Sequence, residues 1–510
     1  MKRLPIGIST FRKIREGGYI YIDKTKEILN LIQDYNYVFL SRPRRFGKSL
    51  LLDTIKEAFE GNKKLFKGLY IYDKYDFTQH PVIKIAFSGN LSKEELINEI
   101  ISNLKEIQEK LDVKCDMTED YAIFFSELIR EVYKKYKKKV VILIDEYDKP
   151  ILDNIDKVGF AKEVREFLRG FYGIIKDSDE YIRFAMLTGV SRFSKVSIFS
   201  GINNLTDISL QSKFNNICGY LEENLLREFG EYFSNAGVDL EEVRKWYNGY
   251  NFGGRERVYN PFDILLFIDN DFEFKNYWFS TGTPSFLIKL LQEREFRLID
   301  FENLEVDERI LNSFDMEKIE LETVLFQTGY LTIKKKEKFL DDTFYILSYP
   351  NKEVRKSFND YVLDYLVERV STKTKIQINL YKVLLLSDLD RLEGILRALF
   401  KSIPYNNFVK NQIARYEGFY ASVLYAYFTG AGFDVIAEDT TNDGRVDLTV
   451  ILGKKVYLFE FKVYDEEPLK QVIEKKYYEK YMSYEEVYGV GIKFNNETRN
   501  IDKYLWLKFK

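Results

Sequence analysis

Histidine is almost absent from this chain, which has a single one, His80, among its 510 residues. Metal sites built from several imidazoles, and enzymes that need two catalytic histidines, are therefore excluded. His80 lies in the segment Thr-Gln-His-Pro before an apolar run, and we interpret it as a turn residue. Acid–base chemistry in this protein must come mainly from carboxylates and lysines.

Cysteine is scarce as well, and the two cysteines, Cys115 and Cys218, form neither a disulfide framework nor a Cys-rich zinc site. No apolar run approaches the ~18 residues that a membrane helix needs. The first residues, Met-Lys-Arg-Leu-Pro-Ile-Gly, lack the apolar core of a signal peptide. These absences predict a cytoplasmic protein with reduced thiols and no membrane contact.

A strong charge of either sign is also missing, because 77 Lys and Arg against 80 Asp and Glu leave a formal net charge of −3. This excludes a protein that is basic over its whole surface, so any contact with nucleic acid must come from a local patch. The chain does have length and apolar content, at 45% hydrophobic and 16% aromatic residues. That is enough for the cores of two or more domains.

The first 215 residues alternate apolar, β-rich runs with helical patterns. Strands are predicted at 37–40, 82–87, 140–144 and 182–187, with helices such as 93–110 and 121–138 between them. Strands separated by helices of this length are typical of a parallel sheet with helices on both faces. We predict an α/β domain over residues 1–215.

Beyond residue 215 the pattern changes twice. Residues 216–400 are predicted to be a mostly helical lid and middle region with a hairpin near 330–347. Residues 401–510 are predicted to be a smaller α/β domain that starts with a helix at 409–428 and a Gly-rich turn at 430–432. Its remaining elements are predicted as strands at 433–438, 445–452, 455–463 and 487–492 and a helix at 469–482.

The segment Ser41-Arg-Pro-Arg-Arg-Phe-Gly-Lys-Ser49 follows a predicted strand and opens a helical pattern. Strand, tight loop, Gly47-Lys48-Ser49 and helix are the layout of a phosphate-binding loop, whose backbone N–H groups attract phosphate oxygens. Lys48 would reach the β- and γ-phosphates of ATP, and the Ser49 hydroxyl would hold Mg²⁺. One position departs from the usual pattern, because Arg42 stands where the first glycine is expected.

A second motif supports the first. Five apolar residues, 140–144, are followed by Asp145 and Glu146 at the carboxyl end of a predicted strand, where open α/β sheets bind ligands. Asp145 would orient Mg²⁺, and Glu146 would polarise the attacking water as general base. An apolar strand often ends in Asp at an ordinary turn, and the alternative to nucleotide binding is a decayed loop with a structural role. The two motifs together, in this order and each after a strand, predict a nucleotide site.

Further polar residues surround the predicted site. Arg42, Arg44 and Arg45 either face the phosphates, which a guanidinium group binds in bidentate fashion, or are solvated loop charges. Thr188 and Arg192 follow the next strand, where Thr188 would sense the γ-phosphate and Arg192 would approach it. The alternative for both is again an ordinary turn.

Another candidate site lies near the C-terminus. A two-residue turn at Gly453-Lys454 would join two strands as a hairpin, and counting outward from it places Asp447 opposite Glu460. Directly opposed carboxylates repel, and Mg²⁺, which prefers hard oxygen ligands, removes this penalty. Lys462, on the same face, would orient or deprotonate a water. The opposite face is predicted to be an apolar core face, formed by Val446, Leu448, Val450, Tyr457, Phe459 and Phe461.

This cluster predicts metal-assisted hydrolysis of a phosphodiester. Two alternatives remain open at this point. The charges of the hairpin face could be solvated and without function, or the site could bind without cutting.

The motifs together resemble a known family, the bacterial and archaeal AAA-ATPase-like proteins with a C-terminal PD-(D/E)XK nuclease-like domain. The resemblance covers nearly the whole chain and implies an AAA-like ATPase module, followed by a helical lid, in which arginine at the first-glycine position is usual. It rests on the block Arg42-Pro-Arg-Arg-Phe-Gly-Lys-Ser49 and on Asp145-Glu-Tyr-Asp-Lys-Pro150, Thr188-Gly-Val-Ser-Arg192, Phe199-Ser-Gly-Ile-Asn-Asn-Leu205, Trp246-Tyr-Asn-Gly-Tyr250 and Tyr277-Trp-Phe-Ser-Thr-Gly282.

The resemblance also implies roles near the hairpin. Glu417 would be an additional acidic residue near the metal, and Gln471 and Lys475 would contact the backbone of a nucleic acid. The predicted function is an ATP-binding protein, an ATPase, coupled to a Mg²⁺-dependent nuclease that acts on nucleic acid, with DNA preferred. The alternatives are a nucleotide-controlled switch or scaffold with a non-cutting nuclease-like domain and a motor that remodels nucleic acid; a homo-oligomer is compatible with each.

Overall fold

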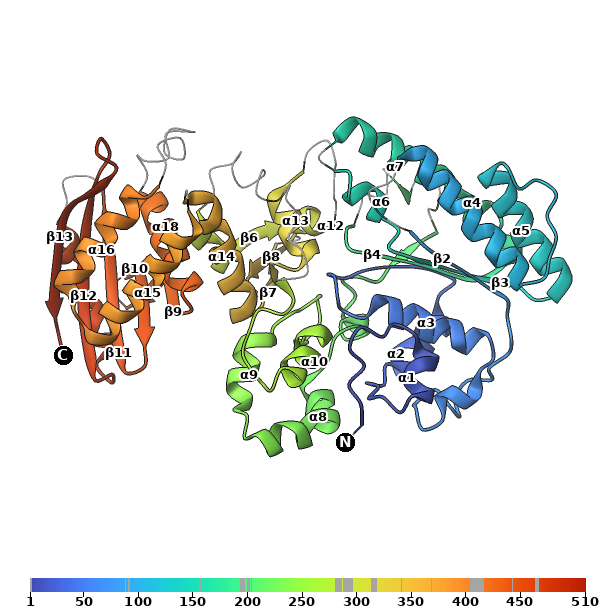
Figure 1. Cartoon of the computed structure of the whole chain (residues 1–510), viewed down its shortest axis with the longest axis horizontal. Helices are drawn as coiled ribbons and strands as arrows, with labels where there is room; N and C mark the ends of the chain where they lie inside the picture. Colours follow the sequence, from blue (N-terminus) through green and yellow to red (C-terminus); the bar gives the residue numbers. More distant parts are fainter. Residues whose placement is uncertain are drawn as a thin grey trace. The chain divides into compact units, whose positions relative to one another are not determined.

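The computed structural model of the chain divides into two compact units, Met1–Thr281 with Glu305–Asn351, and Gly282–Leu304 with Lys352–Lys510 (Figure 1). Each unit has its own sheet and its own core. The structure describes residues 2–87, 89, 92–155, 157–192, 198–199, 202, 204–279, 287, 297–312, 319–340, 342–367, 369–403, 417–442, 444–463 and 467–510.

A five-stranded parallel sheet forms the centre of the first unit, in the order β2-β3-β4-β1-β5. All six residues of β3 are buried, as expected for a strand of a parallel sheet covered on both faces. The four strands predicted from apolar runs in this region are confirmed. The strands are β1 Tyr37–Ser41, β2 Val82–Ala86, β3 Val140–Asp145, β4 Ile182–Gly189 and β5 Thr206–Asp207.

Helices cover both faces of this sheet, with α4, α5 and α7 on one side and α1 to α3 on the other (Figure 1). The sequence marks where two of them begin. Ser92 and Glu95 form a reciprocal capping box at α4, and the Asp120 side chain accepts two N–H groups at the start of α5. The helices are α1 Phe11–Glu16, α2 Thr25–Asp34, α3 Lys48–Phe59, α4 Lys93–Lys110, α5 Tyr121–Tyr136, α6 Lys149–Leu152 and α7 Val158–Asp177.

The rest of the first unit is a small helical group and a three-stranded sheet. The helices α8 Glu222–Ala236, α9 Leu240–Tyr247 and α10 Pro261–Asp269 enclose a core rich in aromatic residues that includes Phe229, Tyr247 and Phe267. The sheet has the order β6-β8-β7, and its β7–β8 pair confirms the predicted hairpin. Its elements are β6 Leu304–Asp307, α12 Glu308–Asn312, α13 Leu321–Thr328, β7 Thr332–Phe339 and β8 Asp342–Ser348.

A second five-stranded sheet, in the order β13-β12-β11-β10-β9, forms the centre of the second unit. Its β11–β12 pair is parallel and its other pairs are antiparallel. The elements are α14 Lys352–Leu366, α15 Val370–Leu386, α16 Leu389–Lys401, α18 Glu417–Gly430, β9 Asp434–Thr441, β10 Gly444–Leu452, β11 Lys455–Lys462, α19 Pro468–Glu474, β12 Glu486–Asn495 and β13 Asn500–Lys508.

Three elements of this unit differ from the sequence-based prediction. The helix expected over 469–482 stops at Glu474 and resumes as a short 3₁₀ helix, Tyr477–Tyr481, because Lys476 adopts a left-handed conformation with φ 50°. Strand β13 was not predicted. Among the described strands it pairs with β12 alone, and it is largely exposed, so it lacks an alternating apolar pattern. Residues 409–416 of the predicted first helix lie outside the described residues.

The division into units also differs from the predicted boundaries at residues 215 and 400. Helices α8 to α10 and the β7–β8 hairpin belong to the unit of the parallel sheet, whereas α14 to α16 belong to the unit of the C-terminal sheet. Helical patterns reveal amphipathic faces and not which sheet those faces cover, so the sequence assigned both groups to one middle region.

No helix in the described part of the chain combines the length and apolar character needed to cross a membrane.

Candidate functional site

The candidate phosphate loop joins the carboxyl end of β1 to the start of α3. Gly47 is the N-cap of α3 and has a φ of 90°, in the left-handed region that glycine adopts without strain. The helix begins at Lys48, so the unpaired N–H groups of its first turn belong to the loop and to the residues that follow it. This is the backbone arrangement that binds phosphate.

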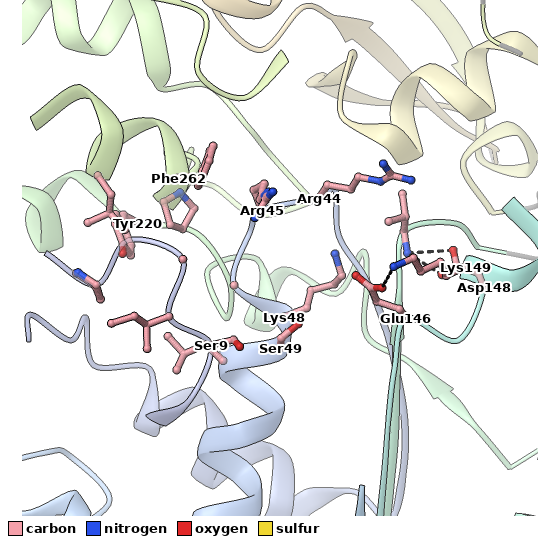
Figure 2. A pocket seen from close by; sticks show the side chains of 18 of the residues that line it. Ser9, Arg44, Arg45, Lys48, Ser49, Glu146, Asp148, Lys149, Tyr220 and Phe262 are labelled. Atoms are coloured by element: carbon pink, nitrogen blue, oxygen red, sulfur yellow. Dashed lines mark hydrogen bonds and ion pairs between the residues drawn. The ribbon is translucent and has the colours of Figure 1, made fainter. Parts of the chain in front are cut away.

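A cavity of about 510 Å³ opens at this loop. One end is polar, and Figure 2 shows Lys48 and Ser49 on one wall and Glu146 on another. Sheet order explains the meeting, because β1 and β3 are parallel strands on either side of β4 and end at the same edge. The other end of the cavity is mostly apolar and is lined by Pro5, Ile8, Tyr220, Phe262 and Leu265.

The Lys48 ammonium group lies across its own loop, where it donates hydrogen bonds to the carbonyl oxygens of Arg42 at 2.9 Å and Pro43 at 3.0 Å. Burial lowers the pKa of Lys48, although the nearby carboxylate of Asp145 acts in the opposite direction. A buried cation held by neutral carbonyls binds an anion strongly once the anion enters the cavity.

The acidic pair that follows β3 is divided between two roles. Asp145 is buried and accepts hydrogen bonds from the Thr188 hydroxyl at 2.8 Å and from the Glu146 N–H at 3.1 Å. Glu146 lines the cavity, has a φ of 52°, and forms an ion pair with Lys149 at 3.0 Å. A positive φ at a glutamate is uncommon, and here it directs the chain so that the side chain reaches the cavity.

Arg42 does not face the cavity, contrary to one of the two interpretations of its sequence position. Its side chain is 1% exposed, and its guanidinium group donates to the carbonyl oxygens of Ser41, Ser209 and Phe214 at 2.8, 2.7 and 3.0 Å. The guanidinium carbon lies 4.0 Å from the centre of the Phe252 ring. Arginine at the first-glycine position therefore anchors the start of the loop to residues behind it.

Arg192 and Thr188 are also placed away from the cavity. Arg192 is held by Asp207, at 2.6 Å between Nη2 and Oδ2, and by the Leu311 carbonyl at 2.9 Å. Thr188 is fully buried and supports Asp145. The strand-end position was predicted correctly for both, but the direction of their side chains depends on β5 and α12, which the local sequence does not reveal.

Arg44 and Arg45 do line the cavity. The Arg44 carbonyl accepts a hydrogen bond from the Trp278 indole at 3.2 Å, which fixes the loop from its far side. Arg44 itself lies 3.9 Å from Asp153, and the Arg45 guanidinium covers the Phe262 ring at 4.7 Å. Loose contacts of this kind leave both guanidinium groups able to turn toward a phosphate.

The candidate carboxylate site lies on the β10–β11 hairpin. The predicted pairing of Leu452 with Lys455 is confirmed, and the paired register runs inward as far as Leu448 and Phe459. Asp447 is the next residue of β10, where its carboxylate accepts the Phe461 N–H at 2.7 Å. Phe461 lies between Glu460 and Lys462 in the chain, so this hydrogen bond holds Asp447 beside the segment that carries both residues.

The face of the hairpin predicted to be apolar is fully buried, and the six residues named for it are 0% exposed. Val446 packs in a cluster with Val456 and Leu458, which lie on the other face of β11. Val446 therefore packs on the opposite side of the sheet from the face predicted for it, because the in–out alternation of side chains along β10 changes beside Asp447.

Glu460 carries an unusual charge environment. Its side chain is 1% exposed, and its Oε1 lies 3.0 Å from the Lys462 ammonium group. Burial, and next the negative charge of Asp447, raise the pKa of Glu460 to about 8, against the influence of Lys462. Burial lowers the pKa of Lys462, but its pKa is raised on balance because Glu460, Glu417 and Asp447 favour the charged form.

The residues implied only by the resemblance are placed as follows. Glu417 is the first residue of α18 and is close enough to Lys462 to influence its pKa. Helix α19 carries Gln471, whose amide donates to the Tyr477 hydroxyl at 3.3 Å, and it ends beside the exposed Lys475. The helix lies directly over β12 at Gly491, which pairs with Glu460, and an added Cβ there would lie 2.6 Å from the Leu469 nitrogen.

Comparison with known proteins gives matches to both halves of this architecture. A family model described as "Predicted AAA-ATPase" matches residues 5–199, and a model described as "PD-(D/E)XK nuclease superfamily" matches residues 415–504. The "Uncharacterized protein in vnfD 5'region" of Azotobacter chroococcum mcd 1 is 45% identical over 510 residues, which cover 98% of each chain. The chain belongs to the predicted AAA-ATPase family with a C-terminal PD-(D/E)XK domain.

A solved structure, Cdc6p from Pyrobaculum aerophilum, is 9% identical and covers 64% of this chain and 88% of its own. Its TM-score of 0.23 is too low to support any argument. The fold of this AAA-ATPase-like protein therefore rests on its own topology and on the family matches, which agree with the predicted α/β class and with the predicted nuclease-like end domain.

Sequence reasoning missed one residue of the AAA-ATPase-like site, Asp148. It lines the cavity, is 1% exposed, and accepts hydrogen bonds from the N–H groups of Val190 at 3.0 Å and Ser191 at 2.6 Å. Burial raises its pKa. Gly189 is required beside it, because an added Cβ would lie 2.4 Å from Asp148 Oδ1. The sequence did contain an indication of this residue, because a second aspartate lies three positions after Asp145 in the segment Asp145-Glu-Tyr-Asp-Lys-Pro150.

The carboxylate site fits a divalent cation on the evidence of its own atoms. Within the described part of the chain, the buried Oε2 of Glu460 has no hydrogen-bond partner, although buried carboxylate oxygens normally have one. Two carboxylates in one buried place raise the pKa of Glu460, and a bound cation reverses that effect. No group of three His, Cys, Asp or Glu side chains among the described residues is arranged to enclose a metal ion. Asp447 and Glu460 are therefore a pair of carboxylates that the structure brings together, and not a group of three.

Proposed function

We propose that this protein binds and hydrolyses ATP in its N-terminal unit and cuts DNA in a Mg²⁺-dependent reaction at the β10–β11 hairpin. The observation that carries the proposal is the buried group formed by Asp447, Glu460 and Lys462, in which Oε2 of Glu460 has no hydrogen-bond partner among the described residues. A buried group of this kind destabilises the folded state, and such groups are found mainly at functional sites.

ATP is the nucleotide expected at the first site. The polar end of the cavity offers Lys48 and Ser49 to the phosphates, with Glu146 on another wall, and the apolar end has room for a base. Lys48 would exchange its two carbonyl partners for phosphate oxygens. Glu146 would hold the attacking water through its carboxylate, and Ser49 and Asp145 would hold Mg²⁺.

At the second site Asp447 and Glu460 would hold Mg²⁺, with Glu417 nearby. The cation, when bound, supplies Lewis acidity toward the phosphodiester. Lys462 stays protonated, because its pKa is raised, and it would orient water and stabilise negative charge on the phosphate rather than remove a proton. Gln471, on the helix that crosses β12 beside Glu460, and Lys475, at the end of that helix, would contact the backbone of the strand being cut.

The test is cleavage of single- and double-stranded DNA with Mg²⁺, with and without ATP, by wild type, Lys48→Ala and Glu460→Ala. We expect cleavage by wild type and no cleavage by Glu460→Ala, which should still bind ATP. Any difference in cleavage rate between the reactions with and without ATP should disappear in Lys48→Ala. A wild type that cuts neither DNA nor RNA with Mg²⁺ or Mn²⁺ would contradict the nuclease assignment. Nucleotide-dependent assembly without cleavage would instead identify a switch or scaffold.

A further inference from the structure

The β7–β8 hairpin is anchored at one end and exposed at the other. At its base Thr332 exchanges two hydrogen bonds with the backbone of Asn251, at 2.7 and 3.1 Å, and Ile333 and Leu347 are buried. Every residue of β7 from Lys334 onward is exposed. The hairpin therefore has a fixed root and a solvent-exposed outer half, longer than the three-stranded sheet needs to bury its own core.

The tip of this hairpin exposes two large apolar side chains, which are followed in the chain by Asp341 and Asp342. Phe339 is 69% exposed and Leu340 is 87% exposed, and Leu340 has a φ of 54°. Glycine or asparagine fills such a left-handed position at lower cost, whereas leucine both strains the backbone and exposes apolar surface. Two costs at one residue, with no gain in packing, indicate a contact that forms outside this chain.

Lysines and a second aromatic ring accompany the tip. Lys335, Lys336 and Lys338 are exposed on β7, and Phe344, 37% exposed, lies across from Glu337 on β8. Glu337 forms an ion pair with Lys335 at 2.5 Å. Exposed aromatic rings interleaved with lysines are the surface that single-stranded nucleic acids bind, through base stacking and phosphate contacts.

The acidic residues limit where the phosphates can run. Asp342 pairs with Phe339 at the tip, so the backbone of a bound strand must follow the lysines of β7 and avoid the turn. Phe339 then meets a base and not a phosphate. This division of roles favours an unpaired strand over a duplex, because a base inside a duplex has no free face to stack on.

The root of the hairpin is packed against the nucleotide site. The Gln327 side chain, on the helix that precedes β7, accepts the Arg192 N–H at 2.8 Å. Gly329 lies so close to Pro43 of the phosphate loop that an added Cβ would be 2.8 Å from its ring. The hairpin is thus carried on the rigid part of the first unit, which suits a surface that must hold a strand in a fixed place.

We propose that the β7–β8 hairpin is a nucleic-acid contact that binds single-stranded DNA, with Lys335, Lys336 and Lys338 on backbone phosphates and Phe339 stacked on an unpaired base. The inference rests on the proposed function in one respect, since it takes as its occupant the nucleic acid that the nuclease-like domain would cut. It assigns DNA contact to the ATPase unit, in addition to the C-terminal sheet.

Fluorescence anisotropy with a labelled single strand, in EDTA and over a range of salt concentrations, tests the lysines without any cleavage. The double variant Lys335→Ala/Lys336→Ala should bind the strand more weakly. It should also reduce the steepness of log affinity against log salt by about 1 to 2, because each lost phosphate contact of a single strand removes about 0.7. The matched control is Lys138→Ala/Lys139→Ala, an exposed adjacent pair before β3, which should leave the slope unchanged.

Phe339→Ser should weaken binding of the single strand about tenfold with the salt slope unchanged, and it should affect the matching duplex less. Thermal unfolding of each variant checks that the exposed substitutions leave the fold intact. Hairpin variants that bind like wild type, or a wild type that binds no DNA, would overturn the inference. Hairpin-dependent binding without any cleavage would support it and remove only the nuclease proposal.

Discussion

Arg42→Gly is the most informative substitution at the phosphate loop, because it restores the glycine that the usual loop pattern has. The Arg42 guanidinium group is 1% exposed, donates to three carbonyl oxygens at 2.7 to 3.0 Å and covers the Phe252 ring. If arginine merely replaced a turn glycine, the substitution would stabilise the loop and improve nucleotide binding. If arginine is an anchor, the substitution does the reverse.

The magnitude follows from these contacts. A hydrogen bond from a charged donor contributes about 1.5 to 3 kcal/mol, and its loss leaves a buried carbonyl without a partner. Burial of the charge offsets part of this, since it lowers the pKa of Arg42 to about 10. Glycine adds roughly 0.5 to 1 kcal/mol of backbone entropy to the cost. We expect the first unit to lose about 3 to 5 kcal/mol of unfolding free energy.

Urea unfolding and calorimetric ATP titration measure the two quantities separately. Arg44→Ala is the matched control, because Arg44 lines the cavity and its side chain is 48% exposed. It should weaken ATP binding and leave stability nearly unchanged, whereas Arg42→Gly should lower stability first. An Arg42→Gly protein that is as stable as wild type and binds ATP more tightly would refute the anchoring role.

Two further substitutions test the sites from other directions. Gly189→Ala should cost about 1 to 3 kcal/mol and weaken ATP binding, because its Cβ would meet Asp148 and the Tyr147 ring, and unchanged unfolding curves would show that β4 has room there. In EDTA, wild type should lose stability as pH rises from about 5 toward 8, since the folded state keeps the Glu460 proton up to a pKa of about 8 and the unfolded chain releases it near 4.5. At about 1.4 kcal/mol per pKa unit the loss is at most about 5 kcal/mol, and a Glu460→Gln protein with the same pH profile would contradict this cause.

The parts of the fold that depend on local pattern were predictable from the sequence. Apolar runs predicted four of the five strands of the parallel sheet, and the two-residue turn at Gly453-Lys454 predicted the pairing of Leu452 with Lys455 in the C-terminal hairpin. Counting from the turn placed Asp447 opposite Glu460; the paired register extends to Leu448 and Phe459, and the charge of Asp447 acts on Glu460. Register and periodicity are properties of a few adjacent residues, so the sequence contains them directly.

Side-chain direction and long-range packing were not predictable in this way. One of the two interpretations of the sequence placed Arg42 and Arg192 near the phosphates, but Phe252, Asp207 and Leu311, distant in the chain, hold them elsewhere. Asp148 was missed because its role depends on the N–H groups that follow β4. Strand β13 was missed because an exposed edge strand lacks the apolar alternation that marks a half-buried one.

The central claim is that the hairpin carboxylates form a metal-dependent nuclease site. The most direct measurement compares Mg²⁺-dependent DNA cleavage by wild type and Glu460→Gln, with Glu486→Gln as the control on the same sheet, where Glu486 is paired with Lys455 and Lys508. We expect cleavage by wild type and by Glu486→Gln, and at least a hundredfold loss in Glu460→Gln, about 2.7 kcal/mol of barrier. Equal cleavage by all three proteins, or cleavage by none, would contradict the account.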